Sequence, residues 1–422
     1  MRVLWLGHNL AFPPVRGVLQ RNYNLLREVA KRSEVHVLAF DQPKTRPPGV
    51  TPEDCVRALR EFCASVTWVP LSRQLDGTDR YVLALRGLMS RDPIDMLWLH
   101  SREMAEKLRK AIEDSEFDVI HFDTLGLAPY KSVVTTAKTV LNHHNVESSM
   151  MSRRASKERN RLTSLYFKLE ARKVREAEKR WCPQFGTNLV VSAEEELELK
   201  KWAPDANTAV VPNGVDTEYF TPCPDPAGRR LLFCGGLDWY PNRDAMVFFF
   251  NAIWPLLASQ VPDVEIYVVG RGPPKWLQRL GERDRRVHVT GFVEDVRPYF
   301  KKAAAYVCPI REGGGTRLKV LDALAMGVPL IGTSFACSGL GLSDGKHVLL
   351  AETPGEFVCK IRQVFDDSEL RYRLAAAGRE IVERMYSWHA IGQTLFGTYE
   401  SVAQAKSVTK AREEFRRHMR LG

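Results

Sequence analysis

Three consecutive glycines followed by two cations form the segment of the sequence with the most evident chemistry. The run Pro309–Gly327 reads PIREGGGTRLKVLDALAMG and carries Arg317, Lys319 and Asp322 after the glycines. Glycines ahead of a helix let backbone N–H groups approach a phosphate, and the helix dipole adds a favourable field. Because that dipole disfavours cations in a first helical turn, Arg317 and Lys319 indicate an anion to be neutralised.

Asp322 lies one and a half turns into this predicted helix, where its carboxylate could accept hydrogen bonds from ribose hydroxyls. The alternative is a tight turn followed by a helix with ordinary surface charges, and a glycine triplet alone would favour it. The glycines, both cations and the acid after a buried strand together favour a phosphate site. We therefore predict that the amides of Gly313, Gly314 and Gly315 bind phosphate.

Apolar runs alternate with helix-length amphipathic stretches along the whole chain, which predicts parallel sheets covered by helices. The alternation restarts after Pro222, so we expect two separate series of strands. The predicted strands are 2–6, 35–39, 66–70, 119–122, 139–142, 189–192 and 208–211 in the first series, and 230–234, 265–269, 287–290, 304–309 and 329–333 in the second.

A proline-rich segment, TPCPDPAGRR at Thr221–Arg230, separates the two series and is typical of a linker. We expect residues 1–221 and 222–385 to form two Rossmann-like, doubly wound parallel-sheet α/β domains that face each other across a cleft. In such sheets ligands bind at the carboxyl ends of the strands.

Composition excludes several classes of protein. With 44% hydrophobic and 27% charged residues, most of the 422-residue chain is not intrinsically disordered. The eight cysteines are scattered without Cys-x-x-Cys spacing, which predicts free thiols in a reducing cytoplasm. The opening apolar run is too short for a signal peptide. Two uncharged runs, 245–262 and 325–343, are interrupted by polar residues, proline or glycine, which argues against membrane spans.

Basic residues are in excess, 61 Lys and Arg against 51 Asp and Glu, so the net charge of +10 favours anionic ligands or surfaces. Met151–Trp181 carries eleven of these basic residues against four glutamates and predicts a long helix or helix pair. Two interpretations remain open for it: a solvated helical face, or a surface for an anionic acceptor or the anionic face of a membrane. Residues 405–422 form a shorter basic tail.

The glycine segment, extended to PIREGGGTRLKVLDALAMGVPLIGT, resembles the donor-binding segment of family-4 retaining glycosyltransferases of the GT-B fold. That family usually has two glutamates separated by seven residues. In this sequence Asp322 stands at the second position and Gly314 at the first. A shift of the loop would let Glu312, two residues earlier, substitute for the missing glutamate, and Thr316 belongs to the same donor-binding segment.

The resemblance extends over nearly the whole chain. VVPNGVDTEYFTP (Val210–Pro222) matches the family's entry into the linker, and LLFCGGLDWYPNRDA (Leu231–Ala245) its first donor-domain strand and glycine loop. That loop contains Gly235 and Gly236. The family commonly has an Arg and a Lys on the diphosphate where this chain has Gly236 and Pro241-Asn242, and the resemblance implies that Arg317 and Lys319 replace them.

Two further strands of the family are matched by VEIYVVGRGP and VHVTGFVEDV. The resemblance implies that the backbone around Phe292 and Val293 meets the nucleobase. Arg271 would stack on the base or reach a phosphate, with an exposed loop arginine as the equal alternative.

In the N-terminal half, GHNLAFPPVRGVLQRNYNLLREVAKR resembles the family's first strand, glycine loop and helix, with Gly17 and Arg21 in the usual places. The family commonly has a histidine that hydrogen-bonds the donor sugar, and in LNHHNVESS the better match is His144, with His143 in reserve. Glu147 would orient that histidine or the acceptor.

The resemblance implies a metal-independent, retaining transfer of a sugar from a nucleotide-diphosphate sugar to a hydroxyl of a glycan or lipid-linked acceptor, in cell-surface polysaccharide or glycolipid synthesis. The catalytic groups would be His144, Arg317 and Lys319. Residues 1–221 would bind the acceptor, 222–385 the nucleotide sugar, and a crossing helix at about 386–404 would return to the first domain. We expect neither cofactor nor nucleic-acid partner, and a cytoplasmic protein that is free or peripheral on the inner face of the membrane.

Two other functions stay open at this point. A nucleotide-sugar epimerase could use the same fold, and a basic protein without enzymatic activity could bind polyanions through Met151–Trp181. A dinucleotide oxidoreductase is disfavoured because no Gly-x-Gly-x-x-Gly follows the first strand.

Overall fold

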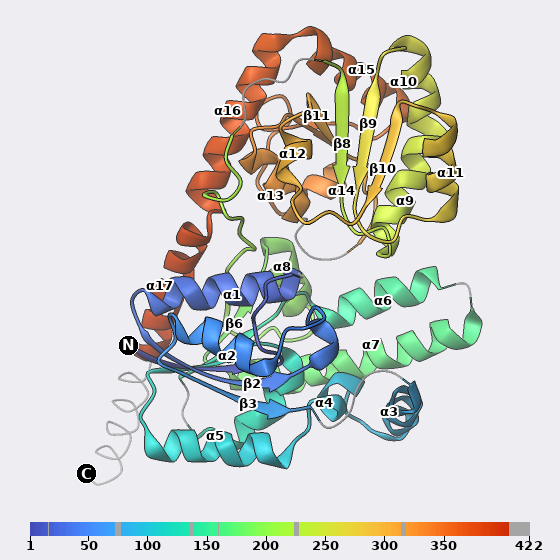
Figure 1. Ribbon diagram of the computed structural model, residues 1–422. Helices are drawn as coiled ribbons and strands as arrows, with labels where there is room; N and C mark the ends of the chain where they lie inside the picture. Colours follow the sequence, from blue (N-terminus) through green and yellow to red (C-terminus); the bar gives the residue numbers. More distant parts are fainter. Residues whose placement is uncertain are drawn as a thin grey trace. The chain divides into compact units, whose positions relative to one another are not determined.

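The structure is a computed structural model that describes residues 1–15, 17–71, 77–135, 138–158, 160–222, 228–313 and 318–404. The chain divides into two compact units. Unit 1 comprises Met1–Pro212 and the returning chain from Ile391, and unit 2 comprises Asn213–Ala390. Each unit is built on a parallel sheet covered by helices (Figure 1), so the predicted α/β class with two doubly wound sheets is confirmed.

In unit 1 the described residues form a parallel seven-stranded sheet in the order β3-β2-β1-β4-β5-β6-β7. The strands are β1 (Arg2–Gly7), β2 (Glu34–Asp41), β3 (Ser65–Pro70), β4 (Val119–Phe122), β5 (Thr139–Asn142), β6 (Thr187–Val190) and β7 (Thr208–Val210). The α-helices are α1 (Gly17–Ala30), α2 (Pro52–Arg60), α3 (Gly77–Met89), α4 (Ile94–Trp98), α5 (Arg102–Asp114), α6 (Glu147–Lys157), α7 (Arg161–Trp181) and α8 (Ala193–Lys200), with 3-10 turns at Pro43–Thr45, Leu125–Val133 and Cys182–Gln184.

The strand order of unit 1 reverses between β1 and β4. The chain builds outward from β1 to β2 and β3, returns to the other side at β4, and continues to β7. Val3 of β1 therefore pairs with Val35 on one side and Val119 on the other. Loops after the two strands at such a reversal diverge and leave room for a ligand at the carboxyl edge of the sheet.

In unit 2 the described residues form a parallel six-stranded sheet in the order β10-β9-β8-β11-β12-β13. The strands are β8 (Arg230–Cys234), β9 (Glu265–Val269), β10 (Val287–Gly291), β11 (Ala305–Cys308), β12 (Leu330–Gly332) and β13 (Leu349–Leu350). The helices are α9 (Tyr240–Phe248), α10 (Trp254–Gln260), α11 (Lys275–Arg283), α12 (Arg297–Phe300), α13 (Leu318–Ala325), α14 (Ser334–Cys337), α15 (Pro354–Asp366) and α16 (Ser368–Met385). The last helix, α17 (Trp388–Gln404), begins in unit 2 and belongs to unit 1 from Ile391 onward.

A π-helical turn at Phe249–Ile253 joins α9 to α10 in the first of the uncharged runs. Pro255, which has no backbone N–H to donate, follows within the first turn of α10. Phe249 and Ile253 are buried in the core of unit 2. None of the described helices has the length and hydropathy needed to cross a membrane.

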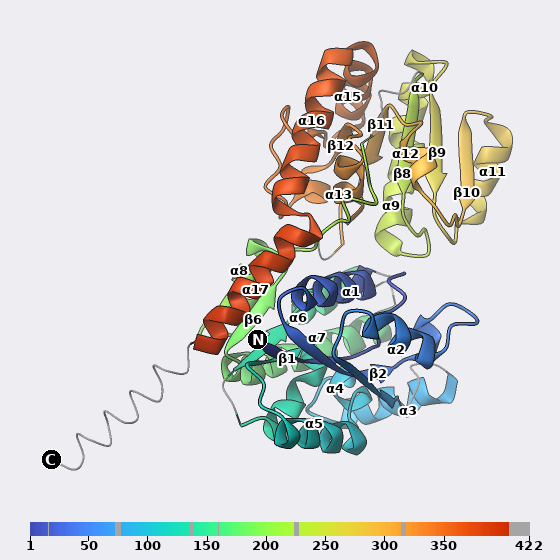
Figure 2. The ribbon, with the colours of Figure 1, turned by 60° about the vertical axis from the view of Figure 1, so that its left-hand side comes forward.

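Helix α17 runs from the end of unit 2 onto unit 1, beside α1 (Figures 1 and 2). Gly392 permits close packing there, because a Cβ at this position would lie 2.4 Å from the Cβ of Glu28 in α1. Farther along, the Tyr399 hydroxyl lies 2.8 Å from Nδ1 of the buried His121 in β4, whose ring stacks on Trp5. The returning helix is thus bonded to the centre of the unit 1 sheet.

Candidate functional site

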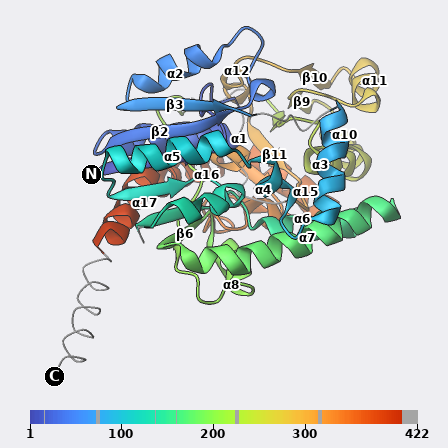
Figure 3. The same cartoon turned by 90° about the horizontal axis from the view of Figure 1, so that it is seen from below.

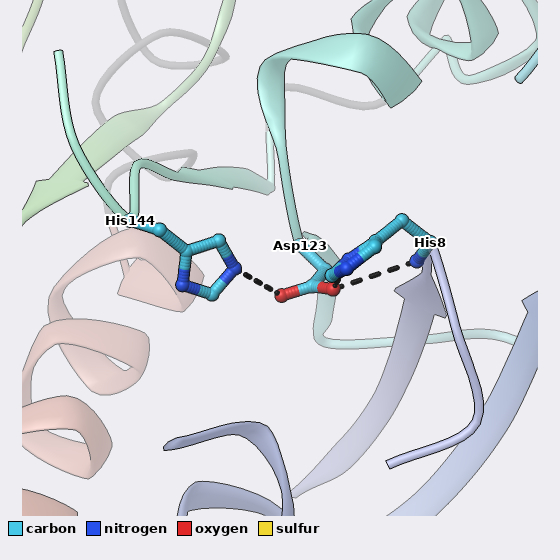
Figure 4. Close-up of side chains that lie close together, drawn as sticks. All are labelled: His8, Asp123 and His144. Carbon is cyan, nitrogen blue, oxygen red and sulfur yellow. Dashed lines mark hydrogen bonds and ion pairs between the residues drawn. The ribbon is translucent and has the colours of Figure 1, made fainter. Parts of the chain in front are cut away.

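Three polar residues of unit 1 lie within two residues of the ends of three neighbouring strands. His8 follows β1, Asp123 follows β4 and His144 lies two residues after β5. Because β1, β4 and β5 are adjacent and parallel, their carboxyl ends lie at one edge of the sheet, next to the reversal of strand order. Figure 4 shows both histidine rings directed at the Asp123 carboxylate, one toward each oxygen.

Asp123 is fully buried, and both oxygens of its carboxylate accept hydrogen bonds. Its Oδ1 accepts a hydrogen bond from Nε2 of His144 at 3.1 Å, and its Oδ2 is bonded to Nδ1 of His8. The side-chain amide of Asn22 in α1 donates to Oδ2 at 2.9 Å. A buried carboxylate with this many donors is held in its charged form and fixes the orientation of both rings.

The three groups shift one another's pKa values in opposite directions. Burial raises the pKa of Asp123, but His8 and His144 outweigh burial and bring that pKa well below its usual value. Burial also lowers the pKa of His8, yet Asp123 offsets this and the net shift is upward. For His144 burial dominates, so its pKa is lowered despite the bond to Asp123. At neutral pH the arrangement favours an ionised Asp123 and a neutral His144.

A neutral His144 has one ring nitrogen that donates and one that accepts. Since Nε2 faces the carboxylate, the hydrogen-bond network assigns the proton to Nε2 and leaves Nδ1 as an acceptor. The imidazole can therefore accept a hydrogen bond from a hydroxyl of a bound ligand.

The same residues have the composition of a metal site. His8, Asp123 and His144 each offer one ligand atom, and these atoms lie within 4.8 Å of one another. Two histidines and a carboxylate suit zinc or non-haem iron. Here the ligand nitrogens point at the carboxylate oxygens, so hydrogen bonds within the cluster account for the geometry without an ion.

The reserve residue, His143, points away from this cluster. It is buried, with Nε2 3.2 Å from Oδ1 of Asn188 and near Sγ of Cys182. Burial lowers the pKa of His143 to about 4, so it is neutral at physiological pH. These contacts give His143 a structural role and leave His144 as the histidine at the strand edge.

Glu147, predicted to orient the histidine or the acceptor, accepts a hydrogen bond from Thr124 at 3.2 Å. Burial, with contributions from Asp95 and Glu178, raises the pKa of Glu147 to about 8. Arg21 is also buried and donates to the carbonyl oxygens of Val211 and Pro212 and to Asn142. Arg21 therefore connects α1 to the ends of β5 and β7.

Gly17 is the first residue of α1 and is exposed. Among the residues predicted from the glycine segment, Gly314, Gly315, Thr316 and Arg317 lie outside the described residues. Their roles stay predictions.

In unit 2 a lysine and a glycine approach each other closely. A Cβ at Gly235 would lie 2.5 Å from Nζ of Lys319 and 2.8 Å from Nδ2 of Asn242. Lys319 donates to Oδ1 of Asn242 at 2.5 Å and lies 5.0 Å from the centre of the Phe233 ring. Gly235 directly follows β8, and Lys319 lies in the first turn of α13. The absence of a side chain at Gly235 thus lets an ammonium group lie over the backbone at the carboxyl end of β8.

Asp322, one turn after Lys319 on α13, is partly buried. Burial raises its pKa to about 7, and Lys319 acts in the opposite direction. Glu312 is also partly buried, and Gly313 has a φ of +134°, a conformation that favours glycine. A Cβ at Gly313 would be in ordinary contact with Pro241, 3.4 Å away. The structure thus brings Gly235, Asn242 and Lys319 together.

The other predicted donor contacts lie at the ends of β8, β9 and β10. Arg271, after β9, is exposed and pairs with Asp238 at 2.9 Å, while Gly236 lies beside both side chains. Phe292, just after β10, is 73% exposed, and Val293 is partly buried. Because neighbouring parallel strands end at one edge, these residues share the edge with Gly235.

Sequence reasoning missed His8 and Asp123. A usable signal was present, because each is a polar residue placed directly after an apolar strand, in WLGHN and VIHFD. What the sequence did not disclose is that these two strands are neighbours.

Comparisons with known proteins agree with this architecture. Residues 15–219 match the family model "Glycosyltransferase Family 4", and residues 228–367 match "Glycosyl transferases group 1". A phosphatidyl-myo-inositol mannosyltransferase of Mycolicibacterium smegmatis is 26% identical over 219 residues, which are 49% of this chain and 56% of that protein. The chain thus spans about half the length of the curated relatives it matches.

Solved structures resemble nearly the whole chain. Sucrose-phosphate synthase from Thermosynechococcus elongatus has a TM-score of 0.67 at 16% identity, covering 96% of this chain and all of that one. Anabaena HepE in complex with UDP-glucose has a TM-score of 0.62 at 14% identity, covering 95% and 100%. At these identities the likeness shows the fold, which is GT-B.

Proposed function

We propose that this chain, which joins the Family 4 and group 1 domains of a glycosyltransferase in one GT-B fold, transfers a sugar from a nucleotide-diphosphate sugar to an acceptor hydroxyl. The observation that carries the proposal is the contact of Lys319 with the side-chain-free edge at Gly235. An ammonium group held over backbone at the carboxyl end of a strand, beside a glycine-rich segment, suits a diphosphate.

In unit 2 the departing diphosphate gains negative charge as the sugar leaves. Lys319 and Arg317, together with the amides of the glycine segment, would stabilise that charge without a metal ion. Asp322 would accept hydrogen bonds from the ribose when ionised. Gly236, Arg271, Phe292 and Val293 would surround the remainder of the nucleotide.

In unit 1 His144 would accept a hydrogen bond from a hydroxyl of the transferred sugar through Nδ1. Asp123 holds the ring in the tautomer that this requires. Gly17 would allow the loop after β1 to approach the sugar. We propose retention of configuration, with the acceptor attacking from the side that the diphosphate leaves and a diphosphate oxygen taking its proton, so that no nucleophilic side chain is needed.

The acceptor is proposed as a glycan or a lipid-linked glycan. Support comes from the mannosyltransferase relative, whose name specifies phosphatidyl-myo-inositol as its acceptor. The proposal that the donor is a nucleotide-diphosphate sugar is supported by the likeness to a structure that holds UDP-glucose.

Calorimetry with uridine diphosphate and guanosine diphosphate tests the donor site. Lys319→Met keeps the length of the side chain and removes the charge, and we expect it to weaken binding of the preferred diphosphate at least about tenfold, as for a lost charge-assisted hydrogen bond. Lys302→Met, an exposed lysine of the same unit, is the matched control and should bind normally.

Turnover with nucleotide sugars then tests the reaction. Release of the diphosphate should depend on the added acceptor and deplete the sugar nucleotide. Interconversion of the sugar nucleotide without release would identify an epimerase and reject the transferase. Equal diphosphate affinity in Lys319→Met and the unmodified protein would reject the donor site.

A further inference from the structure

The sheet of unit 1 has a free edge at β3. β3 is the last strand in the order of that sheet, so among the described strands it pairs with β2 alone. Figure 3 shows β3 at the outer edge of the sheet, with α2 beside it. Where the ladder starts, the N–H of Ala64 donates to the carbonyl oxygen of Val35 at 2.8 Å. Because alternate residues of a strand bond to a given neighbour, the backbone groups of Ser65, Thr67 and Val69 face away from β2.

A cavity of about 760 Å³ lies along this edge. Its walls are formed by α2 and α5, which cover opposite faces of the sheet (Figure 1). Val66, Trp68 and Pro70 of β3 line it with apolar surface. The two helices contribute charged side chains, which are Glu53, Arg57 and Arg60 of α2 and Glu103 and Lys107 of α5. Apolar surface bordered by charged residues is the usual composition of an interface between proteins.

Lys107 bonds α5 to the edge strand. Its ammonium group donates to the carbonyl oxygen of Trp68 at 3.1 Å and pairs with Glu103 at 2.8 Å. On the other wall, Thr51 caps α2 through the N–H of Asp54, whose side chain bonds back to the N–H of Thr51. Both helices are therefore fixed beside β3, and their side chains have set directions along the cavity.

The charges follow the same order on both helices. Glu53 lies in the first turn of α2, and Arg60 is the last residue of that helix, seven positions later. Glu103 lies in the first turn of α5, and Lys110, seven positions later, lines an adjoining cavity together with Ser65. Seven residues make about two turns, so each acid and its cation share a helix face about 10 Å apart. All four are exposed, and within the described part of the chain no side-chain hydrogen bond or ion pair engages Glu53, Arg60 or Lys110.

Topology places the two acids at one end of the edge and the two cations at the other. α2 follows β2 and leads into β3, and α5 leads into β4, so both helices run from the carboxyl end of the parallel sheet back to its amino end. Glu53 and Glu103 therefore lie toward the end of β3, and Arg60 and Lys110 toward its start. The edge is thus negative at one end and positive at the other.

We propose that two copies of the chain associate through this edge, with their β3 strands antiparallel about a twofold axis. Antiparallel strands bring the end of each β3 next to the start of the other, so Glu53 of each copy meets Arg60 of the other copy. Glu103 and Lys110 meet in the same way. The surface is thus complementary to itself in charge, and its free backbone groups face an identical strand. The proposal does not depend on the sugar transfer.

Analytical ultracentrifugation of charge-reversal variants tests the proposal. We expect the full chain to form a dimer whose dissociation constant rises with salt. Glu53→Arg and Arg60→Glu should each raise that constant about tenfold or more, because each replaces attraction by repulsion at two symmetry-related contacts. The variant that carries both changes exchanges the two charges and should dimerise as the unmodified chain does.

Mixing the two single variants tests the pairing of Glu53 with Arg60 directly. Each variant repels its own copies, but a mixed pair has arginine at both positions of one chain and glutamate at both positions of the other. We therefore expect the mixture to form a heterodimer with about the affinity of the unmodified dimer. A surface for a different protein would not give this result, because neither variant would then contact the other.

Matched controls separate this surface from general effects of charge. Arg109→Glu and Glu113→Arg make the same changes at exposed residues of α5 that do not line the cavity, and both should dimerise normally. All variants should keep the melting temperature and diphosphate affinity of the unmodified chain. An unmodified chain that sediments as a monomer throughout, equal losses in the controls, or single variants that fail to associate when mixed would overturn the proposal.

Discussion

Replacing Asp123 by asparagine is the sharpest test of the His8–Asp123–His144 cluster, because it keeps the shape of the side chain and exchanges one acceptor for a donor. Asp123 faces donors on both oxygens: His8 and Asn22 on Oδ2, and His144 on Oδ1. The introduced amide would turn its oxygen toward the first two donors and its NH₂ group toward His144. Nε2 of His144 must then accept, so the proton moves to Nδ1.

The change removes hydrogen bonds to a buried charge, each of which contributes about 1.5–3 kcal/mol. We expect a loss of that size in the free energy of unfolding, and a melting temperature lower by roughly 3–12 °C at about 2–4 °C per kcal/mol for a unit of this size. In the reversed tautomer Nδ1 donates where a ligand hydroxyl needs an acceptor. If the proposed transfer uses that acceptor, its rate should fall about 10- to 150-fold.

Nitrogen NMR of the histidine side chains reports the tautomer directly and does not depend on any activity. We expect the His144 proton on Nε2 in the unmodified protein and on Nδ1 in Asp123→Asn. His143 bonds to Asn188 instead of Asp123 and serves as the internal control, with an unchanged signal. An Nε2–H tautomer that survives in Asp123→Asn, or a rate within twofold of normal, would refute the role assigned to Asp123.

Three further predictions concern other parts of the molecule. Gly235→Ala places a Cβ 2.5 Å from Nζ of Lys319, so it should displace the ammonium group and weaken diphosphate binding about tenfold, as measured by calorimetry. The control Gly355→Ala, whose new Cβ has no atom within 4 Å, should bind the diphosphate normally. Burial raises the pKa of Glu147 from 4.5 to about 8, so the folded state keeps a proton that the unfolded state loses, and the free energy of unfolding falls as the pH rises between those two values. Glu147→Gln should therefore flatten the decline of melting temperature from pH 5 to 8, with a gain in the free energy of unfolding on the order of 3 kcal/mol at pH 7. Equal slopes in the variant and the unmodified protein would contradict the raised pKa. Tyr399→Phe removes the hydroxyl that bonds His121, and should cost about 1–3 kcal/mol in urea unfolding, while Tyr372→Phe on an exposed tyrosine should cost nothing measurable.

The strands were predictable because apolar runs in a parallel sheet are buried on both faces and read as continuous hydrophobic segments. Every predicted strand is present, with ends that differ by at most two residues. The two-residue β13 was missed, since Leu349–Leu350 is too short to form a pattern. The alternative of one helix or two for the basic stretch was decided by Asn160, which begins α7 as its N-cap.

Polar contacts between elements were less predictable, because they depend on strand order and on packing distances. The approach of Lys319 to Gly235 joins residues 84 positions apart, and it is so close that a Cβ at Gly235 would lie 2.5 Å from Nζ of Lys319. The sequence did indicate that Lys319 and the glycines serve one site. The resemblance placed Lys319 at the loop of Gly236 and Asn242, and the described contacts of Lys319 are with Asn242 and the edge at Gly235, while its predicted role beside the glycine triplet stays a prediction.

The choice between His143 and His144 follows from the alternation of a strand continued past its formal end. The N–H of His143 still donates to the carbonyl of Leu189 at 2.8 Å, so the strand geometry persists for one more residue. Side chains on a strand alternate, so His143 shares the face of Leu141, which packs in the core, and His144 shares the face of Asn142, which bonds Arg21. The histidine in register with the apolar residue is therefore structural, and the one in register with the polar residue reaches Asp123. The alternation of side chains would have separated the two histidines from the sequence alone, had it been known that the strand geometry of β5 extends to His143.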